Sequence, residues 1–192
     1  MSNVILTDVD GVLLNWEYAF DVWMLRKGYR PATSAYTAYQ IGERYKITPK
    51  LSRELIRYFN ESAAIGFLPP LRDAIHYVRK LHEECGYVFH VITSLSDDTA
   101  SSALRTMNLK KLFGDTVFEK FVFLDTGADK DKELAKYKDT GYWWVEDKFE
   151  NAVEGAKHGL QPLVMEHGYN MHKKQFPLMK NWKHVYETVT GL

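Results

Sequence analysis

The sequence has little cysteine, no net charge and no long apolar run, and each shortage excludes a class of protein. Cys85 is the only cysteine, so a disulfide framework or a thiolate zinc site cannot form within one chain. The 25 basic and 25 acidic residues cancel, so no overall field would gather nucleic acid or a membrane surface. No apolar stretch approaches the roughly 20 residues that cross a bilayer, and no basic, cleavable start is recognisable. We therefore expect a cytoplasmic protein with no membrane anchor and no strong nucleic-acid signature.

Short apolar strands alternate with helices along most of the chain. Apolar strands that alternate with helices imply a Rossmann-like α/β fold, a parallel sheet with helices on both faces. Such a sheet places ligands at the carboxyl ends of its strands. The pattern predicts strands at 4–8, 87–93, 118–124, 142–145 and 162–165, and helices at 71–84, 97–107, 129–137 and 150–158, with a closing helix around Trp182, Val185 and Val189.

Residues 15–69 break this alternation. Trp16, Phe20 and Trp23 follow one another at spacings of four and three, which place them on one helix face. No strand of comparable strength follows before Pro70. We therefore expect residues 1–14 and 70–192 to form the α/β core domain, and residues 15–69 to form a small helical insertion after the first strand.

Polar side chains stand where four successive predicted strands end. Each group alone is compatible with an ordinary cap or a solvated lysine. Together, at one edge of a parallel sheet, they predict a single polar crevice whose carboxylates and hydroxyls suit a divalent cation and phosphate oxygens. The groups, in chain order, are Asp8 and Asp10; Thr93 and Ser94; Lys130 and Lys132; and Glu146, Asp147 and Asn151.

These residues resemble the four motifs of the haloacid dehalogenase superfamily, which are matched here by Asp8-Val9-Asp10-Gly11-Val12, Thr93, Lys130 and Glu146-Asp147. The resemblance covers nearly the whole chain and implies a phosphohydrolase with a cap over its substrate at 15–69. Asp8 would attack phosphorus and become an aspartyl-phosphate, while Asp10 would protonate the leaving oxygen and later activate water. Thr93 and Lys130 would hold the phosphoryl oxygens. Mg²⁺ would be bound by Asp8, the Asp10 carbonyl and Asp147, with Glu146 assisting.

Two assignments within this resemblance stay open. Lys132 is an alternative to Lys130 as the phosphate-binding lysine. Asn151 stands where many members of the superfamily have an acid, so its part in the metal site is undecided. Phosphate chemistry is favoured over dehalogenation, because Asp10 supplies a proton that a leaving alkoxide needs and a departing halide does not.

The stretch from Asp8 to Phe20 is similar to the opening of the 5'(3')-deoxyribonucleotidases, which implies a small phosphomonoester such as a (deoxy)nucleoside monophosphate. Ser94 and Trp16 are the expected substrate-binding residues. Alternative hypotheses are a phosphatase on polynucleotide ends, a sugar phosphatase or phosphomutase, and a catalytically silent binding protein. Some aromatic residues of the insertion could stack on a base, although aromatics at helical spacing more often form core: Trp16, Tyr18, Phe20, Trp23, Tyr36 and Tyr39.

Overall fold

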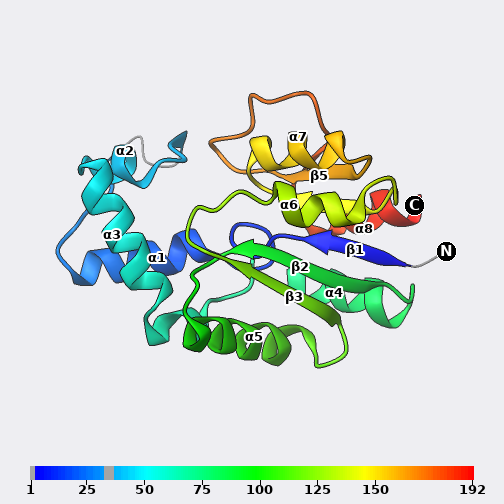
Figure 1. Cartoon of the computed structure of the whole chain (residues 1–192), viewed down its shortest axis with the longest axis horizontal. Coiled ribbons are helices and arrows are strands. Elements are labelled where there is room, and N and C mark those ends of the chain that lie inside the picture. Colours follow the sequence, from blue (N-terminus) through cyan, green and yellow to red (C-terminus); the bar gives the residue numbers. More distant parts are fainter. Residues whose placement is uncertain (1–2, 33–36) are drawn as a thin grey trace.

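The computed structural model describes residues 3–32 and 37–192, and its centre is a parallel β-sheet. Within these residues the sheet has six strands in the order β3-β2-β1-β4-β5-β6, all paired in parallel (Figure 1). The strands are β1 (Val4–Thr7), β2 (Val88–Ser94), β3 (Phe118–Leu124), β4 (Trp143–Glu146), β5 (Gln161–Met165) and β6 (Leu178–Met179).

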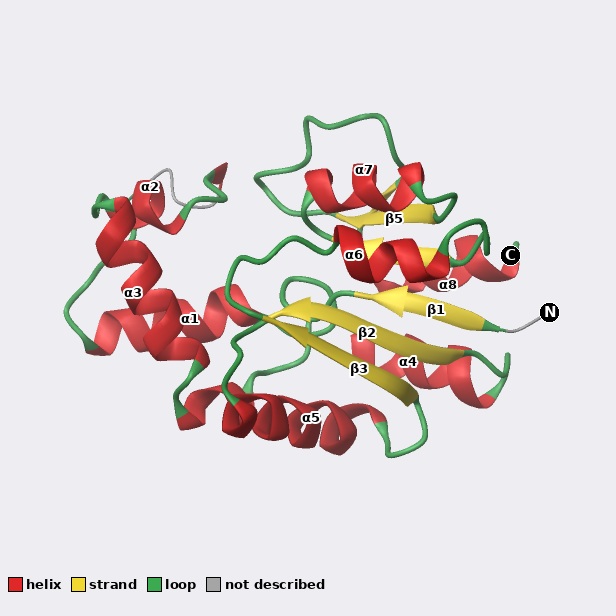
Figure 2. Ribbon diagram, viewed as in Figure 1, coloured by secondary structure: helices red, strands yellow, loops and turns green. Residues whose placement is uncertain are grey.

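Helices cover both faces of the sheet (Figure 2). One face carries α4 (Ala74–Glu83), α5 (Thr99–Phe113) and α8 (Trp182–Thr190). The other carries α7 (Phe149–Lys157) and α6 (Asp131–Leu134), which continues as the short 3-10 helix η3 (Ala135–Tyr137). The Rossmann-like parallel sheet predicted from the sequence is confirmed. No helix within the described residues is long and apolar enough to span a membrane.

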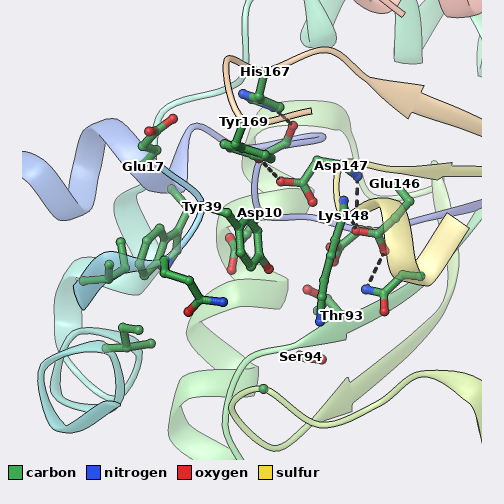
Figure 3. A pocket seen from close by; sticks show the side chains of 18 of the residues that line it. Asp10, Glu17, Tyr39, Thr93, Ser94, Glu146, Asp147, Lys148, His167 and Tyr169 are labelled. Carbon is green, nitrogen blue, oxygen red and sulfur yellow. Dashed lines mark hydrogen bonds between the residues drawn. The ribbon is translucent and has the colours of Figure 1, made fainter. Parts of the chain in front are cut away.

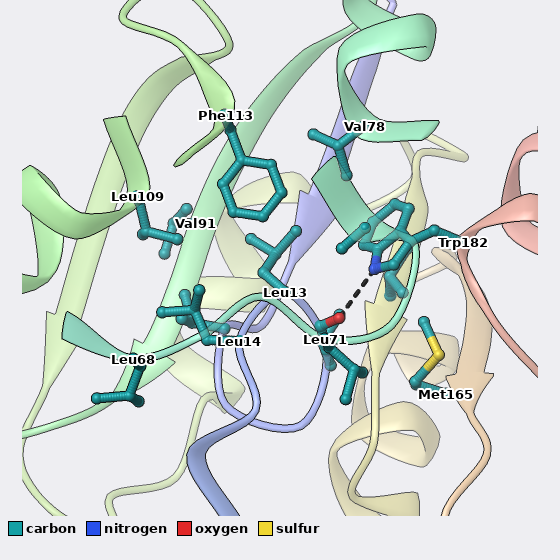
Figure 4. Packing of buried hydrophobic residues seen from close by; sticks show 14 of the residues in the cluster. Leu13, Leu14, Leu68, Leu71, Val78, Val91, Leu109, Phe113, Met165 and Trp182 are labelled. Carbon is teal, nitrogen blue, oxygen red and sulfur yellow. Dashed lines mark hydrogen bonds between the residues drawn. The ribbon is translucent and has the colours of Figure 1, made fainter. Parts of the chain in front are cut away.

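Buried side chains of alternating direction join the sheet to both helix layers. In β1, Ile5 belongs to the larger apolar cluster on the α4, α5 and α8 face, whereas Leu6 packs with Trp144 on the α6 and α7 face. This alternation is the one expected of a strand, where successive side chains point to opposite faces. Figure 4 shows the larger cluster, in which the Trp182 indole donates a hydrogen bond of 2.8 Å to the carbonyl of Val12. The closing helix thus holds the turn that follows β1.

Residues 15–69 form helices and, within the part that is described, no strand. They contain α1 (Trp16–Arg26), α2 (Ile41–Tyr45), α3 (Pro49–Asn60) and the 3-10 helix η2 (Ala63–Phe67). Side-chain caps start two of them: Asn15 accepts from the Tyr18 N–H at 3.2 Å, and Thr48 accepts from the Leu51 N–H at 3.3 Å. We call residues 15–69 the helical segment. In Figure 1 its helices lie beyond the carboxyl ends of the strands.

The two chain crossings between the sheet and the helical segment lie side by side. Leu14 and Pro70 form an isolated antiparallel bridge. The Asn15 N–H donates to the Pro69 carbonyl at 2.8 Å, and the Leu71 N–H donates to the Leu13 carbonyl at 2.8 Å. The chain therefore leaves and rejoins the core through one hydrogen-bonded stem.

Four elements differ from the sequence prediction. Helix α5 runs to Phe113, past the predicted end near 107. Its added turns bury Leu109 and Phe113, which are four residues apart on one helix face, and Gly114 is the C-cap. The predicted helix at 129–137 is one short α-helical turn followed by a 3-10 turn. Strand β6 and helix α2 are too short to give a periodic signal.

Candidate active site

The strand ends predicted to meet do meet, around one cavity of about 360 Å³ (Figure 3). Asp8 follows β1, Thr93 lies near the end of β2, Lys130 precedes α6 and Asp147 follows β4. The cavity is also lined by residues of the helical segment, including Tyr39. The parallel topology accounts for this convergence, since all the carboxyl ends lie at one edge of the sheet.

Lys130 is the lysine at the centre of the site. Its Nζ lies 2.7 Å from Asp8 Oδ2 and 2.7 Å from Glu146 Oε2, and the residue is 3% exposed. Lys132, the alternative in the sequence, is exposed. Burial alone would lower the pKa of Lys130, but the attraction of Asp8 and Glu146 raises it above its usual value. The ammonium therefore stays charged and can bind an anionic oxygen.

Three buried acids face this one lysine. One carboxylate oxygen each of Asp8, Glu146 and Asp147 lies within 4.8 Å of the others. Burial raises the pKa of Asp8 to about 6, and repulsion from Glu146 adds to the effect. Burial, together with repulsion from Asp8, likewise raises the pKa of Asp147 to about 6. Clustered carboxylate oxygens with excess negative charge are the donor set that a hard divalent cation such as Mg²⁺ prefers, so the residues present fit that ion.

Glu146 uses both of its oxygens in hydrogen bonds. Oε1 accepts from the backbone N–H groups of Asp147 at 3.1 Å and Lys148 at 3.0 Å. Oε2 accepts from Lys130 and, at 3.2 Å, from the side-chain amide of Asn151. The side chain therefore orients the lysine and the start of the loop that carries Asp147. Ligation of a metal by Glu146 or Asn151 stays a prediction.

A loop after β5 holds Asp147 from the other side, as Figure 3 shows. The Tyr169 hydroxyl donates to Asp147 Oδ2, and Asn170 donates to the Asp147 carbonyl at 2.8 Å. His167 stacks on Tyr169 with ring centroids 5.2 Å apart, and its Nε2 lies 2.6 Å from the Gly11 carbonyl. Burial lowers the pKa of His167 to about 4, so the neutral ring donates this bond. The sequence did not predict this loop as part of the site, because its residues follow no regular period.

Gly11 is required by the close approach of two site loops. Its φ is +74°, a left-handed conformation that side chains disfavour. A Cβ at this position would stand 2.5 Å from Asp147 Oδ2. Glycine therefore lets the turn after β1 pass directly beneath the acid that follows β4.

Asp10 faces the same cavity, but its partner is a residue that the sequence did not single out. Arg105 of α5 is fully buried, and its Nη1 lies 2.5 Å from Asp10 Oδ1. Burial raises the pKa of Asp10, and the positive charge of Arg105 opposes that rise. An arginine within an ordinary helix sequence gives no signal of burial, which is why the pair was not predicted.

Thr93 and Ser94 differ in their surroundings. The Thr93 hydroxyl is buried and forms no hydrogen bond with the described residues, although it lies close enough to Asp8 to help lower the pKa of that acid. The Ser94 hydroxyl donates to the Ala128 carbonyl at 2.8 Å. Both residues line the cavity. Thr93 thus has a free donor beside Asp8, whereas Ser94 is partly engaged in holding a neighbouring loop.

Trp16 lines the cavity but also belongs to an aromatic cluster. Its indole donates to Asn60 Oδ1 at 2.9 Å, and its ring stacks on Phe20 with centroids 4.5 Å apart. Of the other aromatic candidates, Tyr39 lines the cavity and packs edge-on against Tyr169. Three more do not line it: Phe20 and Trp23 pack in the core cluster, and Tyr18 is exposed. Tyr36 lies outside the described residues.

Comparison of the sequence with known proteins assigns no family to this chain. No family model matches the sequence. An uncharacterized 32.4 kDa protein from the Gp30-rIII intergenic region of Enterobacteria phage T4 is 28% identical over 145 residues, which are 72% of this chain and 51% of that protein. The chain therefore spans about half the length of the curated relative that it matches.

Solved structures resemble the whole chain at low sequence identity. A predicted phosphatase from Clostridium acetobutylicum has a TM-score of 0.65 at 13% identity, and the match covers 100% of both chains. A haloacid dehalogenase-like hydrolase from Streptococcus pneumoniae has a TM-score of 0.64 at 13% identity, over 97% of this chain and 98% of that one. D,D-heptose 1.7-bisphosphate phosphatase from B. bronchiseptica, complexed with magnesium and phosphate, has a TM-score of 0.59 at 12% identity, over 100% of this chain and 99% of that one. The chain has the haloacid dehalogenase-like fold.

Proposed function

We propose that this protein is a Mg²⁺-dependent phosphatase that forms an aspartyl-phosphate on Asp8. The observation that carries the proposal is the contact of Lys130 Nζ with Asp8 Oδ2 at 2.7 Å, within a cluster of three buried acids. A lysine fixed at this distance marks the place where a phosphoryl oxygen would sit beside the nucleophile. The haloacid dehalogenase-like fold, with solved neighbours described as phosphatases, supports the proposal.

Asp8 is oriented for attack by its own hydrogen bonds. Oδ1 accepts from the Val9 N–H at 2.7 Å, and Oδ2 accepts from Lys130. A carboxylate repels an approaching phosphate dianion, and the charge of Lys130 and of a bound cation reduces this repulsion. Mg²⁺, when bound, would be held by Asp8, the Asp10 carbonyl and Asp147, and would neutralise charge on the phosphoryl group.

The other residues of the crevice then have separate tasks. Thr93 would donate its free hydroxyl to a phosphoryl oxygen, and Lys130 would hold a second one. Asp10 would give a proton to the leaving oxygen as the bond from phosphorus to that oxygen breaks. In the second step, the ionised Asp10 would take a proton from the water that attacks phosphorus, which releases phosphate and restores Asp8.

We further propose that the substrate is a small phosphomonoester of the (deoxy)nucleoside monophosphate class. A cavity of about 360 Å³ is within the range of small-molecule sites. Trp16 and Tyr39 give it aromatic walls on the side of the helical segment, where a base would stack. On this proposal residues 15–69 act as the cap that closes over the substrate, and Ser94 lies at its rim.

The first test is release of inorganic phosphate from p-nitrophenyl phosphate. We expect activity with Mg²⁺, none with EDTA, and a loss of at least about 1,000-fold in Asp8→Asn, which keeps the shape but removes the nucleophile. Asp73→Asn is a matched control, since Asp73 accepts from the Trp182 and Lys183 N–H groups far from the crevice. Equal rates in wild type and Asp8→Asn would refute the mechanism.

The second test is a substrate panel of nucleoside monophosphates, sugar phosphates and 3'-phosphorylated oligonucleotides. The proposal expects the highest kcat/KM for a nucleoside monophosphate, with little dependence on salt. A preference for oligonucleotides that weakens steeply with salt would indicate a polynucleotide substrate instead, because each neutralised phosphate releases counterions. Equal, feeble rates throughout the panel would refute the nucleotide proposal.

A further inference from the structure

Arg105 is a buried cation that the proposed chemistry does not yet use. It lies in the middle of α5, the helix that follows β2, and its side chain is 0% exposed. Within residues 3–32 and 37–192, no acidic side chain other than Asp10 pairs with it, and its Nε has no partner. A buried guanidinium needs a partner for its N–H groups, and Asp10 is the acidic side chain that supplies one.

The two ends of this ion pair have different access to the cavity. The Asp10 side chain is 22% exposed and lines the cavity, whereas Arg105 lies behind it. Nη1 is 2.5 Å from Oδ1, but Nη2 is 3.4 Å from Oδ2. Arg105 thus contacts Oδ1 closely and leaves Oδ2 more weakly held.

The position of Arg105 is fixed from the helix side. Asn108, three residues along α5 and also buried, donates to the Leu68 carbonyl at the end of the helical segment. At the N-terminus of α5, Asp98 accepts from the Ser101 N–H at 2.7 Å. A well-anchored helix therefore presents the guanidinium to Asp10, which itself lies on a turn between β1 and the helical segment.

We propose that Arg105 is the positioning residue of Asp10, which it holds with Oδ1 bound and Oδ2 presented to the leaving group and to the attacking water. This inference rests on the proposed phosphatase function and deepens it. In the first step the proton on Oδ2 moves to the leaving oxygen as the Asp8 oxygen bonds to phosphorus. In the second step Oδ2 takes a proton from water while the bond between Asp8 and phosphorus breaks. Arg105 exchanges no proton in either step.

The test compares two substrates that differ in their need for a proton. The leaving group of p-nitrophenyl phosphate is a relatively acidic phenol, which departs without much help, whereas benzyl phosphate releases a weakly acidic alcohol. The measured quantity is kcat/KM, which reports the steps up to the departure of the leaving group. Positioned proton transfer contributes about 100-fold to 10,000-fold. We expect Arg105→Met to lose at least about tenfold more kcat/KM on benzyl phosphate than on p-nitrophenyl phosphate.

Two further variants separate positioning from a structural role. Arg105→Lys retains a charge for Oδ1 and should recover part of the benzyl phosphate activity. Arg79→Met is the matched control, because Arg79 donates to the carbonyls of Leu112 and Phe113 at the other end of α5. It should leave the ratio of the two kcat/KM values unchanged. If Arg105→Met does not fold, the same ratio in Arg105→Lys decides, with a selective loss on benzyl phosphate expected.

The outcomes distinguish this inference from the proposed function. If wild type hydrolyses neither substrate, the phosphatase proposal fails. If wild type hydrolyses both and the Arg105 variants lose the same factor on each, Arg105 is only structural and the inference is overturned. If they instead raise KM and the inhibition constant of inorganic phosphate with no change in the substrate ratio, Arg105 binds the phosphoryl group, which also overturns the inference.

Discussion

Replacing Asp8 by asparagine should make the metal-free protein more stable while it removes activity. Asp8 has a pKa of about 6 in the folded protein against 3.8 for an ordinary aspartate, with burial as the main cause. A raised pKa means that the folded state binds the proton more tightly than the unfolded state. The free energy of unfolding therefore falls as the pH rises from about 4 to about 6, and above that range ionised Asp8 carries the full cost.

The size of this cost follows from the difference between the two pKa values, which corresponds to roughly 3 kcal/mol. Asparagine has no charge to bury beside Glu146 and Asp147, and its side-chain oxygen can still accept from Lys130. We expect Asp8→Asn to raise the free energy of unfolding by about 1–3 kcal/mol at pH 7.5. For a chain of this length each kcal/mol shifts Tm by about 2–4 °C.

The assay is urea and thermal unfolding of both proteins at pH 7.5, in EDTA and in Mg²⁺. Saturating Mg²⁺ should stabilise wild type by about 3 kcal/mol at 100 times Kd and stabilise the variant less, so the gap should narrow. Asp73→Asn, the same substitution at a carboxylate that accepts from the first N–H groups of α8, should be destabilising. If Asp8→Asn unfolded at a lower urea concentration than wild type in EDTA, the reasoning about repulsion among the buried acids would be refuted.

Two further predictions concern the loops that meet at Asp147. Gly11→Ala should lower kcat at least about tenfold and destabilise the fold by about 1–2 kcal/mol, because its Cβ would stand 2.5 Å from Asp147 Oδ2 at a φ of +74°. Phosphate release measures the first effect and urea unfolding the second. An unchanged kcat would contradict the close approach of the two loops. His167 should make stability depend on acid: its folded pKa of about 4 is below the ordinary 6.5, so its contribution is present above 6.5 and is lost as the pH falls toward 4, by roughly 3 kcal/mol. The free energy of unfolding should therefore fall more steeply between pH 7 and pH 4.5 in wild type than in His167→Gln, and equal slopes would count against a buried neutral ring.

The sequence predicted five of the six described strands, because these strands are apolar runs with a clear length. It also placed Asp8, Thr93, Lys130 and Asp147 at neighbouring strand ends, since parallel topology brings those ends together whatever the loops do. The elements that it missed are the ones without a period. A two-residue strand such as β6 and a five-residue helix such as α2 leave too few residues for a pattern.

The support around the site could not be predicted for a different reason. Tyr169 and Arg105 act through contacts with residues far away in the chain, 22 and 95 positions distant. No local spacing records such a contact. Arg105 is the plainer case, because arginine on a helix is usually solvent-exposed, and only its contact with Asp10, on the turn after β1, explains why this one is buried.

The bridge between Leu14 and Pro70 closes the helical segment as a single loop inserted between the first strand and the rest of the core. Its two ends are already held together, so closing a loop of another length there changes the chain entropy only slowly with the number of residues. The register of β1 against β2 and β4 is set by other residues and would persist. An insertion or deletion at this junction can therefore change the helical segment that lines the cavity, while Asp8, Asp147 and Lys130 keep their positions at the strand ends.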